Sequence, residues 1–99
     1  MSDENLVARE AGGFDVNGRV TFDTVPAIYA RSRSMFSGNG PLTLNLAGVV
    51  LADSAGVALL LEWQQEARAA NRSLTFKNFP EQVRRVIRVT GLNEAFGLA

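Results

Sequence analysis

Apolar residues recur along the chain with two different periods, which predict strands and helices in alternation. Alternating runs at 4–10 (ENLVARE) and 13–20 (GFDVNGRV) meet at Gly12-Gly13 and predict a β-hairpin. Asn17-Gly18 in the second run indicates a bulge or a local turn. The chain is therefore expected to begin with two short strands. Their core-facing side chains include Phe14, Val16 and Val20.

A first helix is predicted over residues 24–36. Apolar residues recur there near helical spacing, at Val25, Ile28, Tyr29 and Met35. Thr24 or Asp23 is the expected N-cap, and Pro26 falls in the first turn, where its missing N–H costs nothing. The segment SGNG at 37–40 is expected to end this helix.

The middle of the chain reads as strand, helix, strand. Residues 42–46 (LTLNL) alternate and continue into the apolar run AGVVLA, which predicts a buried central strand. Residues 54–70 are of types that favour a helix. In SLTFK at 73–77, apolar and polar residues alternate again, which predicts another strand. A strand–helix–strand unit of this kind implies parallel pairing of its two strands.

A third helix is expected to begin at Pro80 and to end at Gly91. Its predicted inner face carries Val83, Val86, Ile87 and Thr90, and its outer face carries Arg84, Arg85 and Arg88. The remaining apolar residues form a short tail that should dock back onto the core: Leu92, Ala95, Phe96 and Leu98.

These elements give the order β-β-α-β-α-β-α, an α/β fold with a mixed sheet flanked by helices. Ninety-nine residues supply one core and not two, so residues 1–99 are expected to form a single domain.

Residue types that are missing exclude several kinds of chemistry. The sequence has no Cys and no His, which removes thiol nucleophiles, Cys-based zinc sites and the Ser-His-Asp triad. It contains neither GxxxxGK[ST] nor GxGxxG, so nucleotide hydrolysis by this chain alone is not expected. We therefore predict a protein that is not an enzyme and that holds no metal and no cofactor.

Charge gives no global attraction to polyanions, because ten basic residues balance ten acidic ones. The arginines at 84, 85 and 88 are read as a solvated face or, alternatively, as a docking surface. Aromatic residues do not interleave with them, so nucleic acid is not an expected partner. The N-terminus lacks the features of a signal peptide, and no apolar run approaches 18 residues. We expect a cytoplasmic domain without direct membrane insertion.

Asp53 and Ser54 stand out because they interrupt the apolar run LADSAGVALLLEW. A buried carboxylate without a partner would cost several kcal/mol. The pair falls where the central strand meets helix 54–70, and there the free N–H groups of a helix start can satisfy both side chains. Helix capping is thus the simplest role for Asp53 and Ser54.

Two features suggest a further role for this helix start. Ala55 and Gly56 keep the surroundings of Ser54 small, although Gly costs up to ~1 kcal/mol of helix propensity relative to Ala. A small helix start would suit close approach by another protein or attachment of a phosphoryl group. Apolar residues also lie all round the first two turns, where a surface helix normally shows a single apolar stripe. The predicted partner-binding face comprises Ser54, Val57, Ala58 and Leu61.

The motif Asp53-Ser54-Ala55-Gly56-Val57, between the strand LTLNLAGVVLA and an apolar helix, resembles the STAS domain family. That family is named for sulfate transporters and anti-sigma factor antagonists, and its element order matches this chain over nearly its whole length. In the antagonists, a partner kinase phosphorylates the Ser or Thr that directly follows the Asp. By this resemblance the phosphorylation or switch residue would be Ser54. Ala55 replaces a second Ser or Thr that is common there.

Within the family, the segments DSAGVALLLEW, ARAANRSLTFKNFP and TGL are most similar to the small STAS subunit of the Mla phospholipid-transport ABC system. This resemblance implies a non-catalytic cytoplasmic subunit, peripheral to the inner membrane through its partner. It would bind and support the ATPase subunit of a complex that maintains outer-membrane lipid asymmetry. The alternative is an anti-sigma factor antagonist, regulated at Ser54 by an anti-sigma factor kinase.

Overall fold

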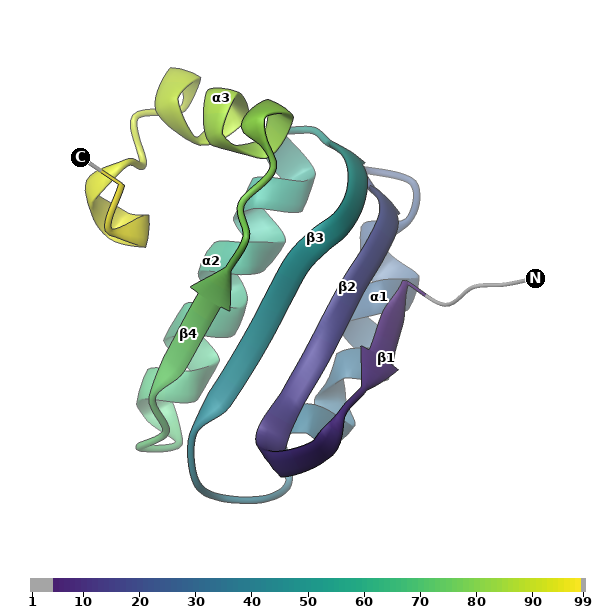
Figure 1. Ribbon diagram of the computed structural model, residues 1–99, viewed down its shortest axis with the longest axis vertical. Coiled ribbons are helices and arrows are strands. Elements are labelled where there is room, and N and C mark those ends of the chain that lie inside the picture. Colours follow the sequence, from purple (N-terminus) through teal and green to yellow (C-terminus); the bar gives the residue numbers. More distant parts are fainter. Residues whose placement is uncertain (1–4, 99) are drawn as a thin grey trace.

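Four strands form one mixed sheet in the computed structural model, which describes residues 5–98 (Figure 1). The sheet order is β1-β2-β3-β4. The hairpin strands β1 (Leu6–Ala8) and β2 (Gly13–Val20) pair antiparallel. The long β3 (Leu42–Ala52) pairs in parallel with both β2 and β4 (Leu74–Lys77). The carboxyl ends of β2, β3 and β4 therefore point toward the same end of the molecule.

Helices cover one face of this sheet. Figure 1 shows α1 (Val25–Ser32) and α2 (Ser54–Ala69) behind the strands, with the other face open toward the viewer. The shorter α3 (Glu81–Val89) lies near the carboxyl end of β3, at the top of the view. Three single turns of 3-10 helix, at Glu10–Gly12, Arg33–Phe36 and Glu94–Phe96, complete the described chain.

The core lies between the helices and the covered face of the sheet. Alternation along β3 buries Leu42, Leu44 and Leu46, which are at most 1% exposed. Trp63 on α2 is fully buried, and its indole N–H donates to the hydroxyl of Ser32 at 2.9 Å. Ser32 in turn donates to the carbonyl of Tyr29 at 2.7 Å, so the polar groups of this pair are satisfied inside the core.

A buried arginine fixes the loop between α1 and β3. Arg72 is only 8% exposed and donates to the backbone carbonyls of Met35 and Gly40, each at 2.7 Å. A third bond, of 3.3 Å, reaches the carbonyl of Asn39. The planar guanidinium thus supplies the hydrogen-bond donors for three carbonyls that have no strand or helix partner in this connection.

The predicted element order, the β1–β2 hairpin and the parallel pairing of β3 with β4 are confirmed. The pairing register of β2 and β3 shifts on either side of Asn17-Gly18, which confirms the irregularity expected there. Residues 1–4 and 99, which belong to the predicted domain 1–99, lie outside the described residues, and so does the first residue of the predicted strand 4–10.

The first helix differs from its prediction at both ends. Regular α-helix ends at Ser32 and not at residue 36, because the Ser32 hydroxyl bonds to a carbonyl of the preceding turn and the chain tightens into 3-10 geometry. Neither predicted N-cap side chain bonds to the helix start. The Thr24 hydroxyl instead accepts the N–H of Thr21 at 2.9 Å, and Asp23 accepts the hydroxyl of Thr21.

The C-terminal predictions hold with two exceptions. Val83 and Ile87 of α3 are buried and Arg84, Arg85 and Arg88 are exposed, but Thr90 is also exposed. The tail docks onto the core through Leu92, Phe96 and Leu98. Ala95 is exposed and contributes only its carbonyl, which accepts from the side chain of Gln64 at 2.9 Å.

Candidate functional site

Asp53 joins two loops at the carboxyl end of the sheet. It is the N-cap of α2, and one carboxylate oxygen accepts the N–H of Gly56 at 3.0 Å. The other oxygen accepts the N–H of Phe22, in the loop after β2, at 2.9 Å. The first bond confirms the predicted cap, which is typically worth about 1 kcal/mol. The second bond was not foreseen, because Phe22 is remote in sequence and no local pattern marks it.

The same bonds keep Asp53 ionised. Burial raises the pKa of its carboxyl group, but backbone N–H groups of Phe22, Gly56 and Ala55 together lower the pKa by more. The net pKa lies below the usual value for Asp. The negative charge of Asp53 is therefore stabilised by N–H groups of the helix start and of the loop after β2.

Gly56 serves the fold. A Cβ atom on this residue would lie 2.1 Å from the carbonyl oxygen of Val20 and 3.3 Å from the Cβ of Ala52. The start of α2 can pass this close to the end of β2 only without a side chain. Our expectation that Gly56 leaves room for a partner or a phosphoryl group is therefore wrong, because the space beside it is filled by β2.

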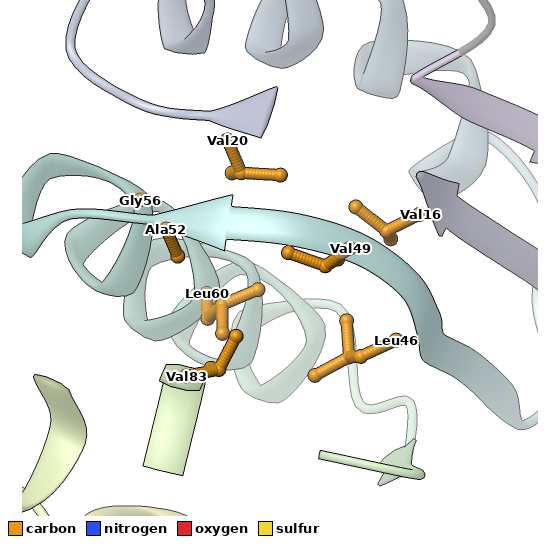
Figure 2. Close-up of a pocket in the computed structure, with 8 residues that line it drawn as sticks. All are labelled: Val16, Val20, Leu46, Val49, Ala52, Gly56, Leu60 and Val83. Carbon is orange, nitrogen blue, oxygen red and sulfur yellow. The ribbon is translucent and has the colours of Figure 1, made fainter. Parts of the chain in front are cut away.

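A small apolar cavity lies under this helix start (Figure 2). Its volume is about 10 Å³ and its lining side chains are aliphatic: Val16, Val20, Leu46, Val49, Ala52, Leu60 and Val83. A space of this size holds at most about one water molecule, which would find no polar side chain to bind. The cavity is a packing defect and not a ligand site.

Ser54 is the first residue of α2 and is exposed. Its hydroxyl makes no hydrogen bond to any other residue within 5–98, so the capping role predicted for Ser54 is wrong and the Asp53 side chain caps the helix without it. Ser54 opens into a groove of about 290 Å³ between the start of α2 and α3. The other groove residues all come from α3 and its C-cap: Gln82, Arg85, Val86, Val89 and Thr90.

The structure divides the residues predicted to bind a partner. Ala58 is exposed on the same side of α2 as Ser54, one helical turn along, and Leu61 is half-buried. Val57 is 0% exposed and belongs to the core, so it cannot offer a contact surface. The apolar character of α2 is explained mainly by burial, since Leu59, Leu60 and Trp63 also face the interior.

The comparisons with known proteins agree with this geometry. The family model described as "Mlab, STAS domain" matches residues 7–98. The chain belongs to the STAS domain family, of the MlaB type. Asp53–Val57, the motif that carried the resemblance, is thus the β3–α2 junction of a STAS domain.

Two solved structures share the fold of this STAS domain. A sulfate transporter family protein from Wolinella succinogenes superimposes with a TM-score of 0.71 at 18% identity, over 92% of this chain and 75% of that one. A protein named Mglu gives a TM-score of 0.55 at 23% identity, over 78% of this chain and 20% of that one. No curated protein matches the sequence. At these identities the likeness supports the fold alone.

Two apolar side chains on elements next to the β3–α2 junction are largely exposed. Phe22, whose N–H binds Asp53, is 79% exposed, and Val89, in the groove, is 82% exposed. Sequence reasoning missed both, although Val89 follows the outward-facing Arg85 by one helical turn and could have been assigned to the same face. We call the surface formed by Phe22, Ser54, Arg85, Val86 and Val89 the Ser54 end.

Gln82 anchors α3 to this end of the sheet. Its side-chain oxygen accepts the N–H of Ala52 at 2.8 Å, and its amide nitrogen donates to the carbonyl of Ala52 at 2.9 Å. The side chain therefore pairs with the last residue of β3 much as a neighbouring strand would. It fixes the distance between α3 and the junction that carries Ser54.

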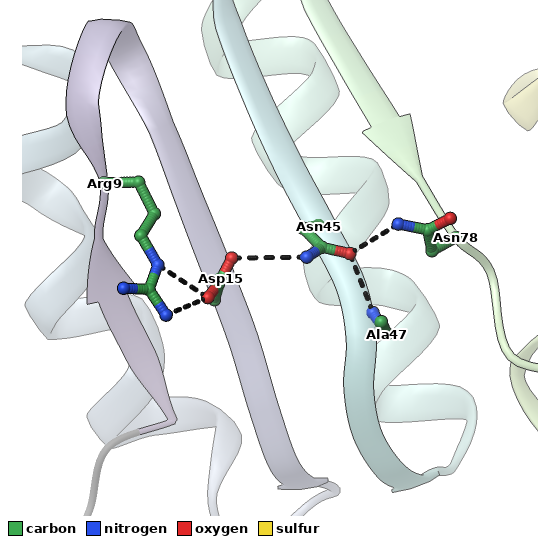
Figure 3. A network of polar contacts seen from close by, with 5 residues as sticks. All are labelled: Arg9, Asp15, Asn45, Ala47 and Asn78. Carbon is green, nitrogen blue, oxygen red and sulfur yellow. Dashed lines mark hydrogen bonds and ion pairs between the residues drawn. The ribbon is translucent and has the colours of Figure 1, made fainter.

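On the open sheet face, by contrast, several polar side chains are paired within the chain (Figure 3), although Val50, on the same long strand β3, is 73% exposed. Arg9 pairs with Asp15 at 2.5 Å, and the amide of Asn45 donates to the same carboxylate at 3.3 Å. The side-chain oxygen of Asn45 accepts the N–H of Ala47 at 3.1 Å and the amide of Asn78 at 2.9 Å. This network links the N-terminal hairpin to the segment after β4.

The described residues contain no helix long and apolar enough to cross a membrane. They also contain no group of three acidic, His or Cys side chains that could hold a metal ion.

Proposed function

We propose that this STAS domain is a non-catalytic subunit of a phospholipid-transport ABC complex, and that it binds and supports the ATPase subunit through the Ser54 end. The observation that carries the proposal is the match of the MlaB-type family model to residues 7–98. The location is supported by the exposed Ser54 and Val89, which line one groove, and by the exposed Phe22 in the loop bound to Asp53, because exposed apolar side chains are typical of an interaction site.

Binding alone is sufficient for such a role. Asp53 is engaged by backbone N–H groups, and the sequence has no His to serve as a base for the Ser54 hydroxyl. A subunit of this kind would act on its partner by preferring one of the partner's conformations. The shift in the ATPase equilibrium is then limited by the difference between the two affinities. Such a subunit would lie at the cytoplasmic side of the inner membrane through its partner.

Substitution of Ser54 by Arg tests the location. A bulky charge at this exposed position would enter the contact without touching the core, so binding to the purified ATPase subunit should be lost while the thermal midpoint is unchanged. Ala69→Arg is the matched control, because Ala69 is exposed at the far end of α2 and should leave binding intact. Wild-type affinity in a folded Ser54→Arg variant would contradict the proposed location.

The exposure of Ser54 favours one other candidate, an anti-sigma factor antagonist switched by phosphorylation. The hydroxyl is accessible at a helix N-terminus, where a phosphoryl group is favoured by the helix dipole. Neighbouring genes distinguish the two functions: an ABC permease and ATPase for the first, a kinase and a sigma factor for the second. Mass spectrometry of the chain purified from its own host tests the phosphorylation directly.

A further inference from the structure

We infer that the groove between Ser54 and α3 is built for an acidic partner segment, in which an apolar side chain is flanked by at least one carboxylate. This inference rests on the proposed function and names the chemistry of the ATPase segment that would occupy the groove. It follows from the apolar floor of the groove, from its arginine wall and from the way α3 is held.

The floor of the groove is apolar. Val86 and Val89 lie three residues apart on α3 and both line the groove, and Val89 is almost wholly exposed. The polar groups beside them are largely engaged. The Gln82 amide is paired with Ala52, and the Thr90 hydroxyl donates to the carbonyls of Val86 and Ile87 at 3.0 and 2.9 Å. An apolar side chain is therefore the occupant that fits this floor.

The wall of the groove is cationic. Arg85 lines the groove, and Arg84 and Arg88 are exposed on the same helix. Within residues 5–98, no carboxylate pairs with any of these three arginines. One acidic residue, Glu81, accompanies them on α3, so the helix carries a local positive excess in a chain of zero net charge. Complementary charge requires carboxylates on the partner, where they would steer association and select against basic segments.

The groove is formed before any partner binds. The paired bonds between Gln82 and Ala52 hold α3 against the end of β3, and Val83 and Ile87 anchor the other side of the helix in the core. A preformed groove loses little conformational entropy on binding. The backbone that carries Arg85 is thus held at a fixed place beside the start of α2.

The test measures the affinity of the purified STAS domain for the purified ATPase subunit of the same host, at about 50 and 300 mM salt. Wild-type affinity should fall as salt increases. Arg85→Glu should weaken binding by about tenfold or more at low salt and should reduce the salt dependence, since Arg84 and Arg88 remain. Val89→Ser tests the apolar floor and should weaken binding at both salt concentrations, because an apolar contact is not screened.

Arg68→Glu is the matched control. Arg68 is exposed near the C-terminal end of α2, about 20 Å from Ser54 at the helical rise, and makes no ion pair within residues 5–98. It should bind as the wild type does. Thermal melts of every variant confirm that each is folded.

The outcomes separate the two proposals. If Ser54→Arg abolishes binding while Arg85→Glu binds with wild-type affinity and salt dependence, the Ser54 end is the interface but its partner segment is not acidic. If wild-type STAS domain does not bind the ATPase subunit at all, the proposed function and this occupant are both overturned. Loss of binding in Arg85→Glu, with retention in Arg68→Glu, supports the inference.

Discussion

Two surfaces of this STAS domain differ in how far their polar side chains are paired within the chain. On the open sheet face, Asp15, Asn45 and Asn78 bond to one another and to Arg9, so their polar groups are paired inside the chain. At the Ser54 end, a hydroxyl and an arginine have no partner among the described residues, and two apolar side chains lie exposed beside them. Polar groups that are already paired within the chain gain little free energy from binding a partner. Unpaired polar groups and exposed apolar side chains gain more, so the Ser54 end is the more favourable surface for an interaction.

The largest expected effect concerns Gly56, which packs against the end of β2 beneath the exposed Ser54 end. Gly56→Ala places a Cβ atom against the carbonyl of Val20, which the packed junction cannot accommodate without shifting. We expect the free energy of unfolding to fall by about 2–3 kcal/mol, measured by chemical denaturation. In the control Gly38→Ala, nothing lies within 4 Å of the new Cβ, and stability should be unchanged or higher by up to about 1 kcal/mol.

A different result for Gly56 would reverse its interpretation. Should Gly56→Ala be as stable as the wild type yet bind the ATPase subunit poorly, the glycine would serve the partner and not the fold.

The next effect concerns the anchor of α3. Gln82→Met keeps the length of the side chain but removes both bonds to Ala52, leaving an N–H and a carbonyl without their partner. Thermal and chemical unfolding should show a loss of about 1–3 kcal/mol. Gln65→Met, at an exposed position of α2, should change stability by less than about 0.5 kcal/mol. Equal stability of the two variants would mean that the Gln82 bonds do not hold α3.

Asp53 should make the free energy of unfolding depend on pH in the acid range. Its pKa is lowered in the folded chain, so the stability that the ionised carboxylate provides is present above the unfolded pKa and is lost as pH falls through the folded pKa. Phe22 and Gly56 donate to different oxygens of the carboxylate, and in an amide one of these oxygens becomes an NH2 group that faces an N–H and cannot accept from it. Asp53→Asn should therefore be less stable than wild type by about 1 kcal/mol at pH 7.

This difference between wild type and Asp53→Asn should begin to narrow as the pH is lowered below about 4, where the carboxyl of the unfolded chain protonates, and should close as the pH passes the lowered pKa of Asp53 in the folded chain. Urea denaturation of both proteins from pH 7 to pH 3 measures it. A gap that stays constant over this range would show that the charge of Asp53 contributes nothing to folding.

The smallest effect is expected on the open sheet face. Asn45→Ala removes bonds to Asp15, Ala47 and Asn78, which are only partly shielded from water, and should cost about 0.5 kcal/mol of stability. Its affinity for the ATPase subunit should equal that of the wild type. A tenfold loss of binding in a folded Asn45→Ala variant would place the interface on the open sheet face and remove the contrast between the two surfaces.

Features that depend on neighbouring residues were predictable from the sequence. The alternation of β3, the start of α2 and the cap at Asp53 each depend on a few adjacent positions, and all are confirmed. The family match confirms the STAS resemblance carried by the same stretch.

Features that depend on contacts across the fold were missed or misjudged. Ser32 ends α1 while its hydroxyl binds Trp63, 31 positions further along the chain. The bonds from Gln82 to Ala52 span 30 positions. The role of Gly56 was misjudged for the same reason, since the atom that excludes a side chain there belongs to Val20 on another strand.

Arg72 limits which substitutions this sequence can accept without loss of structure. Nine of the ten basic residues are arginine. At most surface positions, substitution of arginine by lysine would preserve the positive charge, which is the main property required there. At position 72 the guanidinium spreads its donors over the carbonyls of Met35, Asn39 and Gly40, and the single ammonium of lysine cannot reproduce that fork. Lysine would keep the charge at position 72 and release the loop, so substitution tables that score this exchange as conservative would misjudge it here.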